Sequence, residues 1–483
     1  MPQIDRRTLF KAGALGLASV AAPALASESA SFTHGVASGE PGANRVLLWT
    51  RYVSSGVAKL RWELSDSENF KRIVARGEAE ASPERDCCAK ALATELKPGR
   101  WYWYRFIAAD GTQSPVGRTK TLPVGKVPQF RIAVFSCSNI GFGWFNAYAH
   151  ACEGDQFDLA VHLGDYFYEQ RRGVYPSADK ALAGRPQPEL EAAALATYRE
   201  RLAVYRSDPD LQRLHAHLPM ISCRDDHESA NDAWSGGAEG HQPATEGDWA
   251  VRKAASERAY REWMPVSDDY YASYEIGQLA TLFRLETRHL ARDKQLGLAA
   301  AYLAAKPGEQ EAALIKFRDT VWPDAARGLL GAAQERWLGE GLARSTKARK
   351  PWQVLLQQII MGRRVLPPIA VQGVPAGFPP LYRAALESSV AAGKVNLPFA
   401  MDMWDGYPAA RERLYELALI AKANLVVLAG DSHNGWAFEH DHKGARIGVE
   451  FAGCSVTSPG AEDRKSTRLN SSHVLRSRMP SSA

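Results

Sequence analysis

Short apolar runs recur along the chain, and several of them end at a glycine or an ionisable residue. Residues 159–163 read LAVHL and stop at Gly164 and Asp165, and residues 130–135 and 425–429 form two further runs of the same kind. Apolar runs of this length, bounded by turn residues, are typical of strands buried on both faces of a parallel sheet. The pattern therefore predicts parallel strands whose carboxyl ends carry polar side chains.

Stretches rich in alanine, leucine, arginine and glutamate separate these runs. We expect residues 171–218 to be helical and to form a lid or wall over the strand ends, and residues 298–350 and 408–423 to be largely helical. Strands that alternate with helices from about residue 128 onward indicate an α/β domain with a mostly parallel sheet.

The region from residue 31 to residue 123 has a different pattern. Residues 58–64 alternate apolar and polar side chains with a period of two, residues 45–51 read as another strand, and residues 101–106 are strongly aromatic. Strands at this spacing, separated by glycine and proline turns, indicate a small all-β sandwich of immunoglobulin or fibronectin type. The aromatic residues can form either the sandwich core or a carbohydrate-binding platform, and core packing is the more common use.

Both ends of the chain differ from the regions between them. Residues 1–26 contain the pair Arg6 and Arg7, then an apolar run, then a small-x-small sequence at 24–26, which together indicate a twin-arginine export signal. The apolar run is too short and too weakly hydrophobic for a membrane anchor, the alternative interpretation. Residues 463–483 have no apolar period and resemble translated sequencing-adapter sequence, so we exclude them from the fold and expect the natural carboxyl terminus to be missing.

The composition of the chain mainly excludes some classes of function and fold. The 483 residues carry a formal net charge of +5, but removing the eight basic and two acidic residues of the two terminal segments leaves −1. A nearly neutral enzyme gives no indication of nucleic-acid or membrane binding through bulk charge. The six cysteines do not form the dense pattern of a disulfide framework, so a hydrophobic core must stabilise the fold.

Metal-binding side chains follow the predicted strands. Because ligands collect at the carboxyl ends of strands in open α/β sheets, we expect these side chains to meet at one edge. Carboxylates, imidazoles, a thiolate and a phenolate at one edge are typical of a two-metal hydrolase. The candidate ligands are Cys137, Asp165, Tyr168, the ionisable block Asp225–Glu228, Asp431 and His433.

Each signal has an ordinary structural explanation when it is taken alone. Asp165 could cap the next helix, with Tyr168 as packing. Cys137 could be a small buried hydrophobic residue. The block Asp225–Glu228 (DDHE) could be a solvated turn. The hypothesis of a metal site therefore depends on the agreement of several stretches.

Four spaced motifs agree with one family. The set resembles the alkaline phosphatase D family of the calcineurin-like metallophosphoesterase superfamily, over nearly the whole chain. The resemblance implies an α/β fold, with a layered αββα catalytic domain at residues 128–462 preceded by the β-sandwich at 31–123. The motifs are Ser-Cys at 136–137, Gly-Asp-x-x-Tyr at 164–168, Asp-Asp-His-Glu at 225–228 and Gly-Asp-x-His at 430–433.

The resemblance also implies the metals. It implies Fe³⁺ held by a thiolate, a carboxylate, a phenolate and an imidazole, and Ca²⁺ held by oxygen ligands, with other divalent metals possible at the second position. Asp165 would bridge the two metals, and Asp431 would act through its backbone or its side chain. The implied iron ligands are Cys137, Asp165, Tyr168 and His433, and the implied calcium ligands are Asp165, Asp226 and Asn231.

The implied reaction is hydrolysis of small or polymeric phosphate esters by in-line attack of a metal-bound water or hydroxide. In it, Asp165 and His227 would be catalytic, and His227 would stabilise the transition state or protonate the leaving group. Arg288 would either bind substrate phosphate or pair with Glu286. We expect a periplasmic or secreted monomer that uses the twin-arginine export machinery. The alternative from another class is a catalytically weak, metal-containing binding protein of the cell surface.

Overall fold

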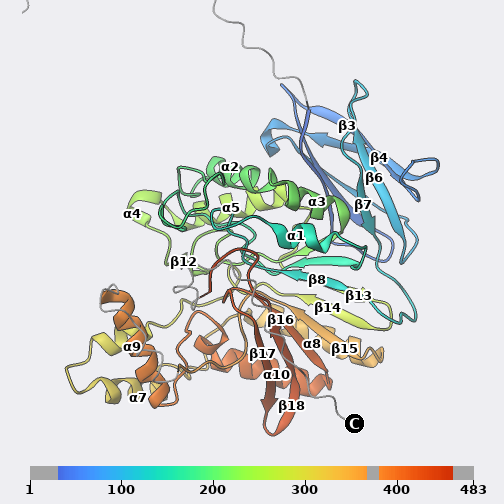
Figure 1. The fold of residues 1–483 in the computed structure, drawn as a ribbon. Helices are drawn as coiled ribbons and strands as arrows, with labels where there is room; N and C mark the ends of the chain where they lie inside the picture. Colours follow the sequence, from blue (N-terminus) through green and yellow to red (C-terminus); the bar gives the residue numbers. More distant parts are fainter. Residues whose placement is uncertain (1–30, 367–379, 461–483) are drawn as a thin grey trace, which may run out of the picture.

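The computed structural model describes residues 31–366 and 380–460, whose arrangement is drawn in Figure 1. The expected export signal at 1–26 and the tail at 463–483 lie outside the described residues. Within those residues the strands form two six-stranded sheets, one four-stranded sheet and a two-stranded ribbon. No helix in these ranges is both long and apolar enough to cross a bilayer.

The first large sheet joins the amino-terminal region to strands that carry the candidate site. Its strands β8, β9 and β10 are mutually parallel, as the apolar runs predict. Strand β1 pairs with β10 through Gly39 and Met220, so part of the predicted sandwich continues into the same sheet. In spatial order the strands are β5 (Cys88–Ala93), β2 (Val46–Val53), β1 (Ser31–Gly39), β10 (Met220–Ser222), β9 (Leu159–His162) and β8 (Ile132–Phe135).

The other amino-terminal strands form the four-stranded sheet, which packs against the β1–β2–β5 part of the first sheet. Val36 of β1 and Leu60 of β3 belong to one buried core together with the aromatic run. Tyr102, Tyr104 and Phe106 are buried, which confirms the core interpretation of that run. The four strands, in spatial order, are β4 (Ile73–Ala81), β3 (Ala58–Ser65), β6 (Trp101–Ile107) and β7 (Gly117–Lys120).

The second large sheet is mixed. Strands β14, β15, β16 and β18 are parallel, and β13 and β17 are antiparallel edge strands. In spatial order the strands are β13 (Ala272–Ile276), β14 (Ala280–Arg284), β15 (Trp352–Leu356), β16 (Leu425–Ala429), β18 (Ala445–Ala452) and β17 (Trp436–His442). The small ribbon consists of β11 (Ala233–Trp234) and β12 (Gly237–Ala238).

Helices cover the outer faces of the two large sheets (Figure 1). One core joins the first sheet to α1, α2, α3 and α5, a second joins the second sheet to α8 and α10, and a third contains apolar residues of both sheets. The catalytic region is therefore layered helix, sheet, sheet, helix. The helices are α1 (Asn146–Ala151), α2 (Leu195–Arg206), α3 (Pro209–His217), α4 (Pro243–Glu246), α5 (Trp249–Trp263), α6 (Leu298–Leu303), α7 (Gln310–Thr320), α8 (Gly331–Lys347), α9 (Pro380–Lys394) and α10 (Pro408–Ala421).

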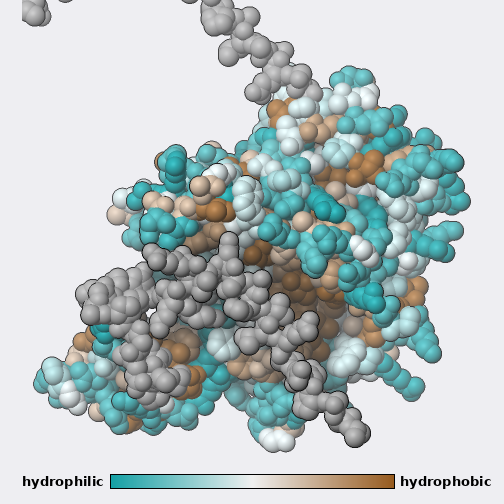
Figure 2. All heavy atoms as spheres, viewed as in Figure 1, coloured by the Kyte–Doolittle hydropathy of each residue, from teal (hydrophilic) through white to brown (hydrophobic). Residues whose placement is uncertain are grey.

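The surface follows the same plan. Figure 2 shows that hydrophilic residues cover most of this face, and that hydrophobic residues gather near its centre, where Figure 1 draws β8 and β16. The apolar side chains between the layers are buried in the three cores, as expected for sheets covered by helices.

The prediction of helix across residues 171–218 is wrong in its first half. Residues 171–194 contain no helix, and α2 and α3 occupy the rest. Gly173 and Gly184 have positive φ angles of 79° and 83°, and three prolines in this stretch cannot donate the backbone hydrogen bonds of a helix. The composition suggested a helix, but these residues break it into an irregular loop.

Candidate active site

The strand ends bring the predicted ligands together through tight turns. Cys137 follows β8, Asp165 follows β9, and Asp431 and His433 follow β16. All four residues have positive φ angles, of 58°, 53°, 58° and 64°. This backbone region is uncommon for residues other than glycine and is concentrated at functional sites. The turns bend the chain sharply at the point where each side chain enters the site.

Gly164 makes the closest approach between two of these turns possible. Its φ angle is 115°, and a Cβ atom placed on it would lie 2.5 Å from Cβ of Asp225. A side chain at this position would therefore push the turn after β9 away from the turn after β10. The glycine of the Gly-Asp motif serves close packing of the two turns as well as backbone freedom.

The four predicted iron ligands converge. Donor atoms of Cys137, Asp165 and His433 lie within 4.8 Å of one another. The Tyr168 hydroxyl donates to Oδ2 of Asp165 at 2.9 Å and lies 3.1 Å from Nε2 of His433. Ser458, near the carboxyl-terminal end of the described residues, places its Oγ 2.8 Å from the same hydroxyl. Thiol, carboxylate, phenol and imidazole thus point at one small volume.

A second group of donors shares Asp165 with the first. Asp165, Asp226 and His227 offer donor atoms within 4.8 Å of one another, as do Asp225, Asp226 and Asp431. Oδ1 of Asp165 and Oδ1 of Asp226 are buried, and neither has a hydrogen-bond partner among the described residues. A buried carboxylate oxygen without a donor is costly unless a cation neutralises it. The donor set and these two oxygens fit a pair of bound cations that share Asp165.

Asn231, the remaining predicted ligand, lies in the loop after the Asp-Asp-His-Glu block. Its backbone N–H donates to Oε1 of Glu169 at 2.7 Å, and its side chain is half-buried. The neighbouring Asp232 donates its backbone N–H to Oδ2 of Asp226 at 2.6 Å. These bonds attach the loop to Asp226 of the second donor group and to Glu169, which contacts His227, and leave the function of the Asn231 amide a prediction.

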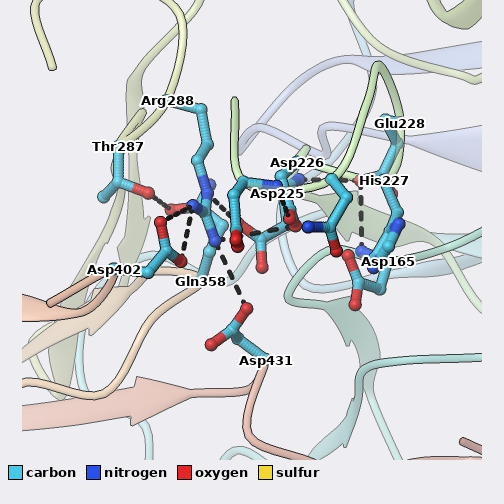
Figure 3. A network of polar contacts seen from close by, with 12 residues as sticks. Asp165, Asp225, Asp226, His227, Glu228, Thr287, Arg288, Gln358, Asp402 and Asp431 are labelled. Atoms are coloured by element: carbon cyan, nitrogen blue, oxygen red, sulfur yellow. Dashed lines mark hydrogen bonds and ion pairs between the residues drawn. The ribbon is translucent and has the colours of Figure 1, made fainter. Parts of the chain in front are cut away.

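Arg288 is the centre of the charged network in Figure 3. Its Nε donates to Asp225 at 2.6 Å, and its Nη1 donates to both oxygens of Asp402 at 2.9 Å. Its Nη2 lies 3.3 Å from Asp431 and 3.6 Å from Asp226. The buried guanidinium therefore contacts four carboxylates.

Glu286, the ion-pair partner considered from the sequence, does not pair with the guanidinium of Arg288. Its carboxylate accepts backbone N–H bonds from Arg288 at 3.0 Å, His289 at 2.6 Å and Leu290 at 2.8 Å. Glu286 thus holds the turn after β14, and the guanidinium is free to reach across to the strand ends of both sheets. The role of Arg288 toward substrate phosphate stays a prediction.

Asp402 is a site residue that sequence reasoning missed. Besides Arg288 it accepts a hydrogen bond from Arg292, and both arginines are buried. Residue 402 lies in an irregular segment between α9 and α10, with no preceding strand. No local pattern marks such an aspartate, since only the tertiary fold brings it to the site.

Glu169 is the second missed residue. Its Oε2 lies 2.7 Å from Nδ1 of His227, and the His227 ring packs against Tyr168, tilted by 37°, with 4.2 Å between ring centroids. Burial opposes a charge on His227, but Glu169, Asp226 and Asp165 outweigh burial and raise the pKa of His227 well above its ordinary value. The position of Glu169 one residue after the Gly-Asp-x-x-Tyr motif was the available signal.

Glu228 ties two strand ends together. Its carboxylate accepts backbone N–H bonds from Asp165 at 3.1 Å, Tyr166 at 2.6 Å and Asp225 at 2.8 Å. Burial raises the pKa of Glu228 to about 7, against the effect of these three donors. This residue fixes the turn after β9 against the turn after β10 and thereby sets the spacing of the donor groups.

Burial also controls the protonation of the ligands. It raises the pKa of Cys137, Tyr168 and Asp165 well above their ordinary values, and nearby carboxylates add to each shift. For Asp226, Arg288 and His227 outweigh burial and lower the pKa. Because thiolate, phenolate and carboxylate are the metal-binding forms, a cation that binds here must displace protons.

Comparisons with known proteins identify the family of this chain. A model of the family "PhoD-like phosphatase" matches residues 132–482, which extends into the segment excluded above, and a model of "PhoD-like phosphatase, N-terminal domain" matches residues 18–123. The chain is 34% identical over 455 residues to the alkaline phosphatase D of Bacillus subtilis (strain 168), covering 89% of this chain and 70% of that protein.

A solved structure gives the same result. A structure of PhoD superposes with a TM-score of 0.71 at 32% sequence identity, and the match covers 88% of this chain and 77% of that one. The sequence family and the mixed α/β fold thus agree. The chain belongs to the PhoD-like phosphatase family and is a phosphoric ester hydrolase.

Proposed function

We propose that this enzyme is an exported, metal-dependent alkaline phosphatase or phosphodiesterase that uses Fe³⁺ and Ca²⁺. The observation that carries the proposal is the shared position of Asp165, which belongs to two donor groups of different chemistry. One group contains a thiol and a phenol, and the other contains mainly carboxylates. A single bridging carboxylate between two unlike groups is the arrangement that a mixed two-metal centre requires.

The donor types support the two metals. Cys137, Tyr168 and His433 together with Asp165 suit a redox-capable transition metal, since thiolate and phenolate are poor ligands for calcium. Asp226, with Asn231 and Asp431 nearby, suits a hard cation that prefers oxygen. When bound, the two metals supply polarisation of the phosphoryl oxygens and a lowered pKa for water.

The residues of the chain supply the remaining functions. The Nδ1 of His227 is held by Glu169, so Nε2 is the nitrogen available to the substrate. Glu169, Asp226 and Asp165 raise the pKa of His227 against the effect of burial, and the imidazolium would donate a proton to the leaving-group oxygen. Arg288 contacts Asp225, Asp226 and Asp431 and holds them in place, and its binding of substrate phosphate remains a proposal.

The wider setting follows from the family. We place the layered catalytic domain, at residues 128–462, in the calcineurin-like metallophosphoesterase superfamily. The twin-arginine sequence near residue 6 favours export in the folded state, with metals bound beforehand, to the periplasm or the medium. Family membership favours the enzyme over the metal-containing binding protein considered above. Small or polymeric phosphate esters are the proposed substrates, and we expect a monomer.

Metal analysis combined with ester hydrolysis tests the proposal. The purified chain should contain iron and calcium, show visible charge-transfer absorption from thiolate or phenolate, and hydrolyse p-nitrophenyl or bis-p-nitrophenyl phosphate. Cys137→Ala should lose iron, colour and activity. Cys152→Ala is the matched control, because Cys152 is a buried thiol that bonds the carbonyl of Tyr148 outside both donor groups. A folded, active enzyme without metal would refute the proposed mechanism.

A further inference from the structure

Two aromatic side chains stand beside the candidate metal centre. Phe142 and Tyr175 pack edge to face with ring centroids 4.8 Å apart, and we call this pair the aromatic wall. The Tyr175 ring also lies 5.5 Å, centroid to centroid, from Tyr168. Burial, followed by the charges of Asp165 and Cys137, raises the pKa of Tyr175. The wall is therefore a direct neighbour of the predicted iron ligands.

The wall is held rigidly by the loop that replaces the expected helix. Asn139 donates its side-chain Nδ2 to the carbonyl of Tyr175 at 3.2 Å, and Leu182 donates its backbone N–H to Gly141 at 2.8 Å. A Cβ on Gly141 would lie 2.6 Å from Cδ of Pro176, so the two loops are in close contact. A preorganised aromatic surface can bind a ring without further ordering of the protein, which favours affinity.

Tyr175 keeps part of its surface available. Both Tyr175 and Phe142 are half-buried rather than buried. In the part of the chain that the structure describes, the Tyr175 hydroxyl has no hydrogen-bond partner, whereas that of Tyr168 contacts Asp165, His433 and Ser458. Tyr175 is thus fixed through its backbone and ring edge, and the function of its remaining surface is not accounted for by packing.

Charge decides what this side of the site can accept. Arg288 is engaged by four carboxylates, and His227 is engaged by Glu169. The ring of Tyr175, 5.5 Å from that of Tyr168, offers aromatic carbon beside the predicted iron ligands. A phosphate monoester would turn a second negative charge toward it, while a diester can turn an organic group toward it. Aromatic carbon favours the organic group.

We propose that the aromatic wall of Phe142 and Tyr175 binds the second ester group of a phosphodiester, and that it selects groups that carry a planar ring. This inference rests on the proposed hydrolysis at the adjacent centre and adds the substrate class. Tyr175 and Phe142 would act as specificity-determining residues that contact the group retained on phosphorus. The ring stacks on Tyr175, and Phe142 supports it from behind.

The test uses four esters with one leaving group, p-nitrophenol: p-nitrophenyl phosphate, its methyl diester, bis-p-nitrophenyl phosphate and thymidine 5′-p-nitrophenyl phosphate. Loss of an aromatic contact should lower kcat/KM about threefold to tenfold. Tyr175→Ala should cause this loss with the two ring-bearing diesters and less than about a twofold loss with the methyl diester. If the losses for the two ring-bearing diesters differ, the larger loss shows whether the wall prefers an aryl group or a nucleoside. Tyr175→Phe should keep the preference for rings.

Controls separate specificity from damage to the metal centre. Trp352→Ala removes an aromatic residue that is 43% exposed at the start of β15, the end of the strand opposite the site, and it should change no ratio. Iron content and charge-transfer absorption of Tyr175→Ala should equal those of the parent enzyme. Equal losses with all four esters would overturn the inference, since the ring would then serve the centre itself.

A measurement on the unaltered enzyme keeps the inference testable if Tyr175→Ala does not fold. Phenylphosphonate should inhibit bis-p-nitrophenyl phosphate hydrolysis about threefold or more better than methylphosphonate. Equal inhibition would overturn the inference and leave the proposed function intact. A metal-loaded enzyme that hydrolyses none of the four esters would instead overturn the proposed function.

Discussion

Replacing Glu169 by glutamine tests how His227 is held. The substitution keeps the size of the side chain and removes the negative charge that lies 2.7 Å from Nδ1 of His227. Oε1 of Glu169 also accepts the Asn231 N–H at 2.7 Å, so a single amide oxygen cannot serve both donors. Either the imidazole or the Asn231 loop loses its partner.

The magnitude follows from the type of bond. Hydrogen bonds to charged groups contribute about 1.5–3 kcal/mol. At about 1.4 kcal/mol per factor of ten, the expected loss in kcat/KM is about tenfold to a hundredfold. This is smaller than the about 10² to 10⁴ that general acid catalysis can supply in total, because a misplaced histidine retains part of its effect.

The assay varies the basicity of the leaving group. A basic alkoxide needs the proton of His227, while p-nitrophenolate leaves with little help. The loss should therefore be largest for alkyl esters and only about a few-fold for p-nitrophenyl esters. A plot of log kcat/KM against leaving-group pKa should become steeper in Glu169→Gln.

Glu257 provides a matched control. It is a buried glutamate whose Oε1 lies 2.9 Å from Nδ1 of His289, in a pair that is outside the donor groups. Glu257→Gln should lower stability without changing the leaving-group slope. If Glu169→Gln lowered the rates of all esters by one factor, the assignment of His227 as the leaving-group acid would be refuted.

Two further predictions concern stability. Arg288→Met leaves Asp225, Asp402 and their neighbours without a cation, so the free energy of unfolding of the metal-free protein in urea should fall by about 3–5 kcal/mol, and added metal should restore part of it. The control is loss of the partly exposed pair of Arg413 with Glu335, which should cost about 1 kcal/mol or less. An equal cost for both changes would contradict the charge argument. Burial, with Arg51 and Arg206, lowers the pKa of His34 from 6.5 to about 4. The unfolded chain therefore binds more protons than the folded protein between these pH values, and His34 destabilises the fold as the pH falls below 6.5. Relative to the parent protein, the stability of His34→Gln should be about 1–2 kcal/mol more favourable at pH 5 than at pH 7, and an unchanged difference would refute this pH dependence.

The strand ends were predictable because their information is local. An apolar run that stops at Gly164-Asp165 or Gly430-Asp431 predicts a buried strand and a polar turn at once, and parallel pairing then forces the ends of neighbouring strands together. The sequence could not give the left-handed turns at Cys137 and His433. Those turns depend on the packing of one strand end against the next.

Elsewhere, contacts between residues far apart in the sequence could not be predicted. Strand β1 was expected in a separate sandwich, yet Gly39 pairs with Met220 and joins the catalytic sheet. The polarity of its side chains reports only burial, and burial does not identify the sheet that accepts the strand edge. For the same reason Asp402 had no signal. Its partners Arg288 and Arg292 are more than a hundred residues away in sequence.

The balance of charge explains why bound metals neutralise the carboxylates of this site better than the cationic side chains of the protein do. Buried carboxylates come from both sheets, and the cations that face them are mainly Arg288, Arg292 and His227. Arg288 alone is shared by four carboxylates, so each receives only part of one charge. Asp165 and Asp226 still present oxygens without donors among the described residues. Protons can neutralise this excess only by removing ligands, while two cations neutralise it and keep every ligand charged. The predicted rise in stability of Arg288→Met on addition of metal is therefore a direct measure of how the fold and the catalytic centre share one set of charges.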